Sequence, residues 1–310
     1  MLRTCLALAL MAWMFACGDE RPSTVDAPPR PGTLDARADA NANCSNIDEC
    51  AWIDEELGDI VAALSGQTEV SPGVRLAHRA SISERAASRA LLTATAQRLG
   101  LDIRGQPYVS GENMVIHLQG TNDAAPHVVM GAHFDSVPAG PGAADNATGT
   151  AMAIVTAAYL AKQPRQRSID FVLFDEEELG LIGSRAYVDE LQASGAAVHA
   201  MHNYDMLSFD GDGDRVLELW SPTPGLAALY QRVAAERSMS TTTVSFTRSD
   251  HQAFLEAGMP AVGVGEEFST GDHTPHYHQS TDSFDKVDFA FLGDVTRLAI
   301  VAVGASANEP

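Results

Sequence analysis

Five segments of the chain carry histidine or acidic side chains at or just after an apolar run. They are VVMGAHFDSV with His133 and Asp135, GAADNATG with Asp145, FVLFDEEELG with Asp175 to Glu178, NYDML with Asp205, and PHYHQSTD with His278. Imidazole nitrogens and carboxylate oxygens are ligands for divalent cations, Zn²⁺ first among them. Two histidines and three carboxylates are too few for two separate closed sites, so one carboxylate would bridge two ions and leave positions open to water. Open positions predict catalysis rather than a structural role.

Each motif taken alone also has an ordinary structural explanation. His133 could be a buried histidine paired with Asp135, Asp145 could cap a helix, and the acidic run could begin a solvated helix. Four adjacent carboxylates at the carboxyl edge of a sheet nevertheless repel one another unless a cation or solvent relieves the repulsion. Asp205, within an apolar strand, needs a partner that the local sequence does not supply. The metal-site interpretation therefore depends on the five motifs together.

The elements that would position these residues alternate between strands and helices. Short apolar runs predict strands at 113–118, 127–132, 168–174, 199–207, 215–220 and 261–265. Helical patterns fall at 53–64, 83–99, 147–162, 179–192, 224–236, 250–257 and 286–303. This alternation predicts a single α/β domain with a largely parallel central sheet covered by helices on both faces. In such a fold the ligand site lies beyond the carboxyl ends of the strands, where the motifs fall.

Size and charge restrict the classes of function. The 310 residues are 45 % hydrophobic, which is enough for one substantial core. The formal net charge is −21 and the pI is near 4.7, so the field of the protein repels nucleic-acid phosphates and anionic lipids. We therefore expect no nucleic-acid partner.

The N-terminal region predicts export from the cytoplasm. The apolar run at 5–17 is shorter than the roughly 20 residues that span a bilayer, and it is typical of a signal peptide, here residues 1–16. Cys17 follows Ala16 as in a bacterial lipoprotein processing site, so we expect a lipid anchor there, with ordinary secretion as the alternative. Membrane contact would be through this anchor alone. Residues 17–43 are Pro-rich and predict an extended tether before a domain at 44–310.

Export also predicts a disulfide bond. Cleavage removes Cys5 and lipidation uses Cys17, so Cys44 and Cys50 remain as a pair that an oxidising compartment should bridge. Metal binding by this pair is the weaker alternative, because no histidine or further cysteine lies near it in the sequence.

The motifs between Asn113 and Asp288 together resemble the secreted bacterial zinc aminopeptidases and their glutamate carboxypeptidase relatives, metallopeptidase family twenty-eight. All five motifs occur in the family's order, and SDHQAF at 249–254 is similar to a family motif that lines the pocket. Thr148 stands where the family usually has Ser. The resemblance implies a zinc exopeptidase fold of the phosphorylase/hydrolase-like type.

The resemblance also implies roles for individual residues. It implies that two Zn²⁺ ions are bound, one by His133, Asp145 and Asp205 and the other by Asp145, Glu178 and His278. It implies that Glu177 is the general base, with Asp135 orienting His133. The choice of Glu177 over Glu176 depends on the Leu179-Gly180 that follows. Tyr277, next to His278, is a candidate to bind the tetrahedral oxyanion, or else a wall of the pocket.

The implied function is that of an extracytoplasmic aminopeptidase acting on the N-termini of peptides or proteins. A water between the two metals would give its proton to Glu177, which would then protonate the leaving amine. The main alternative is glutaminyl-peptide cyclisation with a single zinc on a related fold, but His133, Asp145 and Asp205 together favour two metals. A non-catalytic peptide-binding lipoprotein is the other alternative, and such a protein would be expected to have lost ligands.

Overall fold

The computed structural model describes residue 44, residues 46–122 and residues 124–309. The expected signal peptide, the lipidation site at Cys17 and the tether at 17–43 lie outside the described residues.

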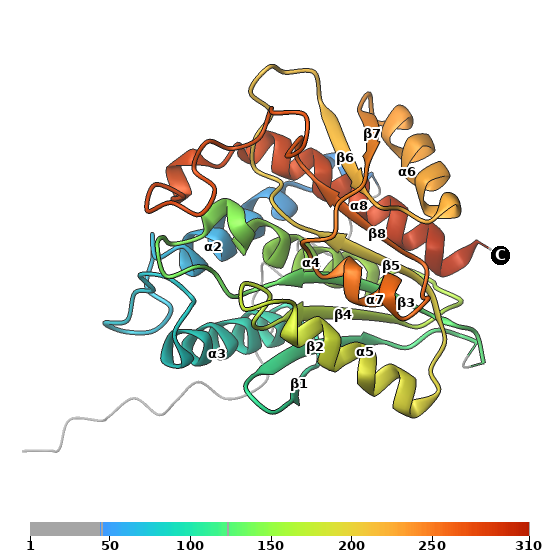
Figure 1. Ribbon diagram of the computed structural model, residues 1–310, viewed down its shortest axis with the longest axis horizontal. Coiled ribbons are helices and arrows are strands. Elements are labelled where there is room, and N and C mark those ends of the chain that lie inside the picture. Colours follow the sequence, from blue (N-terminus) through green and yellow to red (C-terminus); the bar gives the residue numbers. More distant parts are fainter. Residues whose placement is uncertain (1–43, 45, 123, 310) are drawn as a thin grey trace, which may run out of the picture. The chain divides into compact units, whose positions relative to one another are not determined.

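An eight-stranded mixed sheet runs through the middle of the described domain (Figure 1). The strands are β1 (Ile103–Pro107), β2 (Glu112–Leu118), β3 (His127–His133), β4 (Ile169–Phe174), β5 (Val198–Tyr204), β6 (Val216–Trp220), β7 (Ser240–Val244) and β8 (Ala261–Gly265). They lie in the order β1-β2-β4-β3-β5-β8-β6-β7. β4, β3, β5 and β8 are parallel, whereas β2 and β6 run antiparallel to β4 and β8. The carboxyl ends of the four central strands therefore meet at one edge.

Helices cover both faces of the sheet (Figure 1). One face packs against α2 (Ala51–Leu64), α3 (Ile82–Arg98), α4 (Thr148–Leu160), α6 (Pro224–Glu236) and α8 (Phe289–Asn308), and the other against α5 (Ile182–Ser194) and α7 (His251–Glu256). The short turns η1 (Ile47–Glu49), η2 (Ala143–Ala147) and η3 (Phe284–Lys286) complete the elements. The predicted α/β domain with helices on both faces is confirmed.

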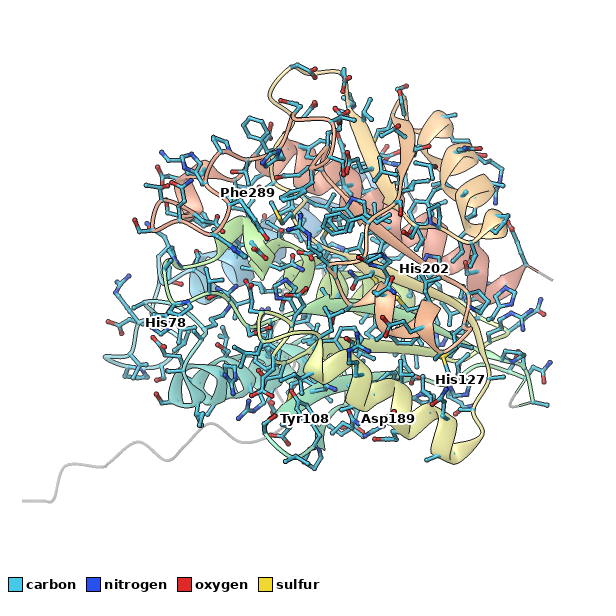
Figure 2. The ribbon with its side chains drawn as sticks, viewed as in Figure 1. His78, Tyr108, His127, Asp189, His202 and Phe289 are labelled. Carbon is cyan, nitrogen blue, oxygen red and sulfur yellow. A yellow bond between two sulfur atoms is a disulfide. The ribbon has the colours of Figure 1, made fainter. Side chains whose placement is uncertain are left out.

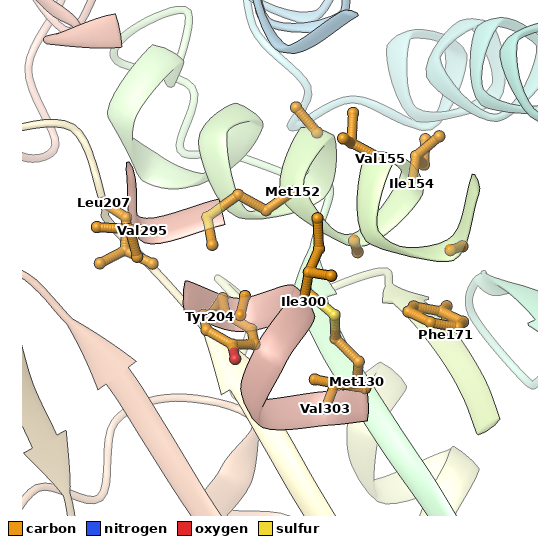
Figure 3. Close-up of a cluster of buried hydrophobic side chains, with 14 of the residues drawn as sticks. Met130, Met152, Ile154, Val155, Phe171, Tyr204, Leu207, Val295, Ile300 and Val303 are labelled. Atoms are coloured by element: carbon orange, nitrogen blue, oxygen red, sulfur yellow. The ribbon is translucent and has the colours of Figure 1, made fainter. Parts of the chain in front are cut away.

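The alternation of side chains along the strands divides the core into two layers. In β4, Phe171 faces the layer of α2, α4 and α8, whereas Val172 faces α5 and α7. Figure 3 shows Met130 of β3 beside Val303 of α8 in the larger layer. By length and composition α8 could cross a bilayer, but 67 % of its most apolar window is buried inside the domain. The apolar side chains of α8 therefore pack in the core of the domain.

Two edge strands and one helix start differ from the expectations. The sequence did not predict β1 and β7, because IRGQP and STTTV are polar and stay partly exposed at the two edges of the sheet. The helix expected from residue 179 begins at Ile182. Residues 175–181 form a loop instead, with positive φ angles of 61° at Glu176 and Leu181.

The predicted disulfide bond between Cys44 and Cys50 is present, with a Cα–Cα distance of 5.5 Å. Cys50 is buried and directly precedes α2. Arg297 of α8 donates to the Cys50 carbonyl at 3.3 Å and pairs with Asp54 of α2 at 2.8 Å. The disulfide bond thus links Cys44 to the point where α2 contacts α8.

A second charged cluster lies at the amino-terminal edge of the parallel strands. Asp170 of β4 lies between two histidines, with its Oδ1 2.6 Å from His117 Nδ1 of β2 and its Oδ2 3.0 Å from His127 Nδ1 of β3. Figure 2 labels His127, which begins β3. This cluster joins three adjacent strands on the side of the sheet away from the motif residues.

Candidate metal centre

The residues predicted to bind metal lie where the central strands end. His133 is the last residue of β3, and Asp205 follows the last residue of β5. Asp145 lies in η2, after β3, and Glu178 lies in the loop that follows β4. His278 comes from the loop between β8 and η3. The parallel order of β4, β3 and β5 is what brings these separate segments together.

Asp145 lies between the two predicted histidines. Its Oδ1 is 3.2 Å from His133 Nε2, and its Oδ2 is 3.2 Å from His278 Nε2. On the outer sides, His133 Nε2 lies 3.3 Å from Asp205 Oδ1, and His278 Nε2 lies 3.1 Å from Glu178 Oε2. The five side chains therefore form two sets of nitrogen and oxygen atoms that share one carboxylate.

The charges of this cluster fit positive ions. Five carboxylates surround the two imidazoles, so a negative excess remains even when both imidazoles are protonated; they are Asp135, Asp145, Glu177, Glu178 and Asp205. Glu178 Oε1 is buried and has no hydrogen-bond partner among the described residues. Groups of three side chains, His133-Glu177-Asp205 and Asp145-Glu178-His278, each place ligand atoms within 4.8 Å of one another. This donor set is the kind that Zn²⁺ accepts.

The pKa shifts in the cluster reflect the same negative excess. Burial lowers the pKa of His133, but the charges of Asp205 and Glu177, together with hydrogen bonds to Asp135 and Asp145, hold that pKa well above the ordinary value. Hydrogen bonds to Asp145 and Glu178 raise the pKa of His278 to about 10. Burial raises the pKa of Glu177 well above its usual range, while nearby His133 opposes that shift. Without a bound cation, the carboxylates therefore favour the protonated, positively charged form of both imidazoles.

The four acids after β4 separate into two pairs. Asp175 Oδ1 and Glu176 Oε1 each lie 2.8 Å from the guanidinium of Arg85 in α3. Glu177 and Glu178 instead face the histidines: a carboxylate oxygen of Glu177 lies within 4.8 Å of a His133 nitrogen, and one of Glu178 lies within 4.8 Å of a His278 nitrogen. Asp175 also pairs with Arg89 at 3.0 Å, so two guanidinium groups balance the charges of the first two acids and Glu176 is held away from the cluster. The sequence contained no signal for the pairing with Arg85, because it comes from a helix far earlier in the chain.

Asp135 contacts two parts of the cluster at once. Its Oδ1 lies 3.3 Å from His133 Nδ1. Its two oxygens also accept hydrogen bonds from the backbone amides of Glu177 at 3.1 Å and Glu178 at 3.2 Å. One buried carboxylate therefore fixes the His133 ring and the loop that carries both glutamates.

Other contacts position Asp145 and Asp205, and sequence analysis did not identify them. Asp282 accepts hydrogen bonds from the backbone amides of Ala144 at 2.8 Å and Asp145 at 3.1 Å. Ser249 donates its hydroxyl hydrogen to Asp205 Oδ2 at 2.7 Å. Asp282 lies in PHYHQSTD and Ser249 lies in SDHQAF, but nothing local in the sequence reveals which distant group either residue contacts.

Buried Arg79 supports the loops that follow β3. Its guanidinium donates to the carbonyl oxygens of Phe134 at 2.6 Å, Leu64 at 2.9 Å and Gly142 at 2.8 Å. Gly142, with φ of 65°, begins the turn into η2, the segment that presents Asp145. A fully buried arginine bound to carbonyl oxygens had no recognisable sequence signal.

Aromatic side chains form the mouth of the cluster. Tyr277 stacks on the His278 ring at 3.8 Å and meets Phe268 edge-on at 5.0 Å. Burial raises the pKa of Tyr277 above its ordinary value, the carboxylates of Asp145 and Glu178 add to this, and Arg248 opposes it. The hydroxyl therefore keeps its proton and can donate a hydrogen bond. The pocket also includes the side chains of Met206, Trp220, Phe246 and Arg248.

Comparison with known proteins identifies relatives of this chain. Residues 113–303 match the family described as peptidase family M28. The chain is 35 % identical over 221 residues to the probable lipoprotein aminopeptidase LpqL of Mycobacterium tuberculosis, which covers 61 % of this chain and 44 % of LpqL. The chain spans about half the length of the curated relatives it matches.

Solved structures share the fold. The LapA aminopeptidase of Legionella pneumophila aligns with a TM-score of 0.71 and 20 % identity, covering 86 % of this chain and 77 % of LapA. BSAP, a zinc aminopeptidase from Bacillus subtilis, aligns with a TM-score of 0.58 and 27 % identity, covering 64 % of this chain and 51 % of BSAP. A glutaminyl cyclase of Porphyromonas gingivalis aligns with a TM-score of 0.65 and 18 % identity over 80 % of this chain and 96 % of the cyclase.

The family match extends from β2 into α8, and it therefore includes every strand end that contributes to the cluster. This chain belongs to peptidase family M28.

Proposed function

We propose that this chain is an extracytoplasmic zinc-dependent aminopeptidase that hydrolyses the first peptide bond of peptides or proteins. The observation that carries the proposal is the place of Asp145, whose two oxygens each lie 3.2 Å from a different imidazole nitrogen. Membership of family M28 supports a peptidase reaction. The similarity to LpqL, a probable aminopeptidase, supports the kind of peptidase, and the similarity to BSAP, a zinc aminopeptidase, supports the metal.

We assign the ligands of two Zn²⁺ ions to the two sets that share Asp145. One set adds His133 and Asp205, and the other adds Glu178 and His278. When bound, the two ions would lower the pKa of a water molecule and polarise the scissile carbonyl. With three protein ligands for each ion, positions for water and substrate remain open.

Glu177 is assigned as the general base. Its carboxylate shares a group with His133 and Asp205 and lines the pocket, so it can take the proton of the attacking water and return it to the leaving amine. Asp135 acts as a positioning residue, because it holds the amide of Glu177 and the ring of His133. Tyr277 is assigned to the oxyanion of the tetrahedral intermediate, since it lines the same pocket and stacks on His278.

We further propose that residues 1–16 are a signal peptide, that residues 17–43 tether the catalytic domain at 44–310, and that Cys17 carries a lipid. The description of LpqL as a lipoprotein supports the anchor. The disulfide bond between Cys44 and Cys50 supports an oxidising compartment. Secretion without lipid remains the alternative that mass spectrometry of the mature N-terminus distinguishes.

Glutaminyl cyclisation with one zinc is the second candidate, and the fold shared with the Porphyromonas gingivalis cyclase is the observation behind it. A single zinc would leave either His133 with Asp205 or Glu178 with His278 without a metal to bind. The paired arrangement therefore favours two ions and hydrolysis.

The deciding experiment combines metal analysis with three substrates. We expect about two zinc ions per chain, hydrolysis of leucine p-nitroanilide, and no hydrolysis of its N-acetylated form, because an aminopeptidase needs the free amine. A peptide with N-terminal glutamine should lose that residue without releasing ammonia from its side chain. One zinc ion with ammonia release would establish the cyclase instead, and metal without any turnover would establish a binding protein.

A further inference from the structure

Among the described residues, Arg248 is the arginine that lines the acidic pocket. It lines the same pocket as four carboxylates, those of Asp145, Glu177, Glu178 and Asp205. Its guanidinium carbon lies 5.1 Å from the centre of the Phe246 ring and 5.5 Å from that of Phe268. In the part of the chain that the structure describes, no carboxylate forms an ion pair with it.

Three other arginines near the cluster already bind protein groups. Arg79 is buried and bonded to backbone carbonyl oxygens, whereas Arg85 is buried and bonded to Asp175 and Glu176. Arg89 pairs with Asp175 at 3.0 Å. Arg248 differs because it is exposed and its guanidinium lies over the Phe246 and Phe268 rings. The N–H groups at the edge of the guanidinium are therefore available to a ligand.

The two aromatic rings that contact Arg248 also pack against other residues that line the pocket. Phe246 packs on Trp220 at 4.5 Å, and Phe268 meets Tyr277 edge-on at 5.0 Å. On the chain itself, the next residue, Ser249, is held by its hydrogen bond to Asp205. The two rings therefore hold the guanidinium at a defined place relative to the assigned metal ligands.

We propose that Arg248 binds a carboxylate of the substrate and so makes the enzyme selective for substrates that carry one near the scissile bond. The planar guanidinium matches a carboxylate with two parallel hydrogen bonds, which the compact charge of lysine does not reproduce. The carboxylate has two chemical sources, an acidic side chain on the N-terminal residue or the terminal carboxylate of a dipeptide. A net charge of −21 otherwise disfavours anionic substrates, so the local cation is needed to accept one. This inference rests on the proposed aminopeptidase function.

The experiment compares substrates that differ only in one negative charge. Leucyl-glycine is compared with leucyl-glycinamide, and glutamyl p-nitroanilide with glutaminyl p-nitroanilide, using the wild type, R248M and R248K. In one of the pairs we expect R248M to lower kcat/KM for the charged member about tenfold more than for the neutral member, mainly through KM. R248K should recover part of the difference, and added salt should reduce it in the wild type.

Controls separate this inference from the proposed function. R104M removes an equal charge from β1, outside the residues that line the pocket, and it should leave both substrate ratios unchanged. The pair that responds identifies the source of the carboxylate. An equal loss for charged and neutral members in R248M would mean that Arg248 only supports the aromatic rings, and unchanged ratios would equally overturn the inference. A wild-type enzyme that hydrolyses none of the four substrates would overturn the proposed function and this inference with it.

Discussion

His278 Nε2 lies 3.2 Å from Asp145 Oδ2, although five strands separate the two residues along the chain. The other oxygen of Asp145 lies at the same distance from His133. A carboxylate placed in this way belongs to both ligand sets, so its loss should have a larger effect on metal content than the loss of either histidine.

Metal content should therefore distinguish D145A from H133A. We expect about two zinc ions in the wild type, about one in H133A, and almost none in D145A, because only Asp145 serves both sets. Plasma mass spectrometry of protein dialysed against trace zinc measures this. H127A, at the far edge of the sheet, is the matched histidine control and should keep both ions. A D145A variant that retained one tightly bound ion would show that the two sets do not depend on the shared carboxylate.

Substitutions along the acidic run should have three different effects. E177Q should reduce peptide hydrolysis by about 10² to 10⁴-fold with metal content intact, because glutamine keeps the size of the side chain but cannot accept the proton of water. E178Q should lower zinc occupancy, and added zinc should partly restore its activity. Kinetics with zinc titration, together with circular dichroism, measures each effect.

E176Q is the matched control for these variants, because Glu176 pairs with Arg85 and lies away from the cluster. It should retain most of the activity and lose some stability instead. If E176Q were inactive while E177Q kept normal turnover, the assignment of the base would be off by one residue. Normal activity in all three variants would exclude the proposed mechanism.

The sequence predicted the interior of the fold better than its edges. β3, β4 and β5 are predictable because they are short apolar runs bounded by turn residues. A strand that is buried on both faces must be apolar along its whole length. β1 and β7 escape prediction because an edge strand needs little apolar surface, and their sequences are polar. Tertiary pairing, rather than local propensity, makes them strands.

The candidate site follows the same pattern. His133 and Asp205 are visible in the sequence because each interrupts or ends an apolar run. The partners of the motif residues are not visible, because Asp282 and Arg85 contact segments far away in the chain. Spacing along the chain can place a ligand at a strand end, but it cannot show which distant group orients that ligand.

Asp282 should control metal affinity without binding metal. Its carboxylate holds the amides of Ala144 and Asp145, so D282N should keep only one good acceptor and loosen the turn that presents Asp145. We expect zinc affinity to fall about 10 to 100-fold, as is typical when a residue that orients a ligand is changed. Competition with a chromogenic chelator measures the affinity.

The matched control is D285N, an exposed acid three residues further along the chain. It should bind zinc as the wild type does. A D282N variant with unchanged zinc affinity but reduced melting temperature would show that Asp282 has only a structural role.

The disulfide bond should stabilise the start of the domain by a moderate amount. The loop that it closes is short, so removing it by the double substitution C44A/C50A should cost about 2 to 3 kcal/mol of unfolding free energy. Urea denaturation with and without a reductant measures this. Reductant should destabilise the wild type to a similar extent and leave the double variant unchanged. Two freely alkylated thiols in protein isolated from the cell envelope would contradict the predicted bridge in the cell.

Stability should depend on pH through Asp170, which lies between His117 and His127 at the edge opposite the candidate metal ligands. Burial opposes ionisation of this carboxylate, but hydrogen bonds from the two histidines lower its pKa to about 2. The hydrogen bond to Asp170 likewise raises the pKa of His117 above its ordinary value of 6.5. The Tyr187 hydroxyl is a further hydrogen-bond partner of Asp170. The stabilisation from the lowered Asp170 pKa is present above about pH 4 and is lost as pH falls toward 2. The stabilisation from the raised His117 pKa is present in full below about pH 6.5 and is lost as pH rises from there through the raised pKa.

The stability difference between the wild type and D170N should therefore be largest between about pH 4 and pH 6.5, amount to at most about 2 kcal/mol, and shrink on both sides. Urea midpoints at about pH 3, 5.5 and 9 measure it. Acid also affects metal binding, but this effect should be the same in the wild type and D170N, because Asp170 lies at the opposite edge of the sheet from the candidate metal ligands. Comparing the two proteins at each pH therefore removes it. D189N, an exposed acid of α5, is the matched control and should give a small difference that does not change with pH. A D170N difference that stayed constant from pH 3 to pH 9 would mean that Asp170 stabilises the strands through packing and neutral hydrogen bonds, and not through its charge.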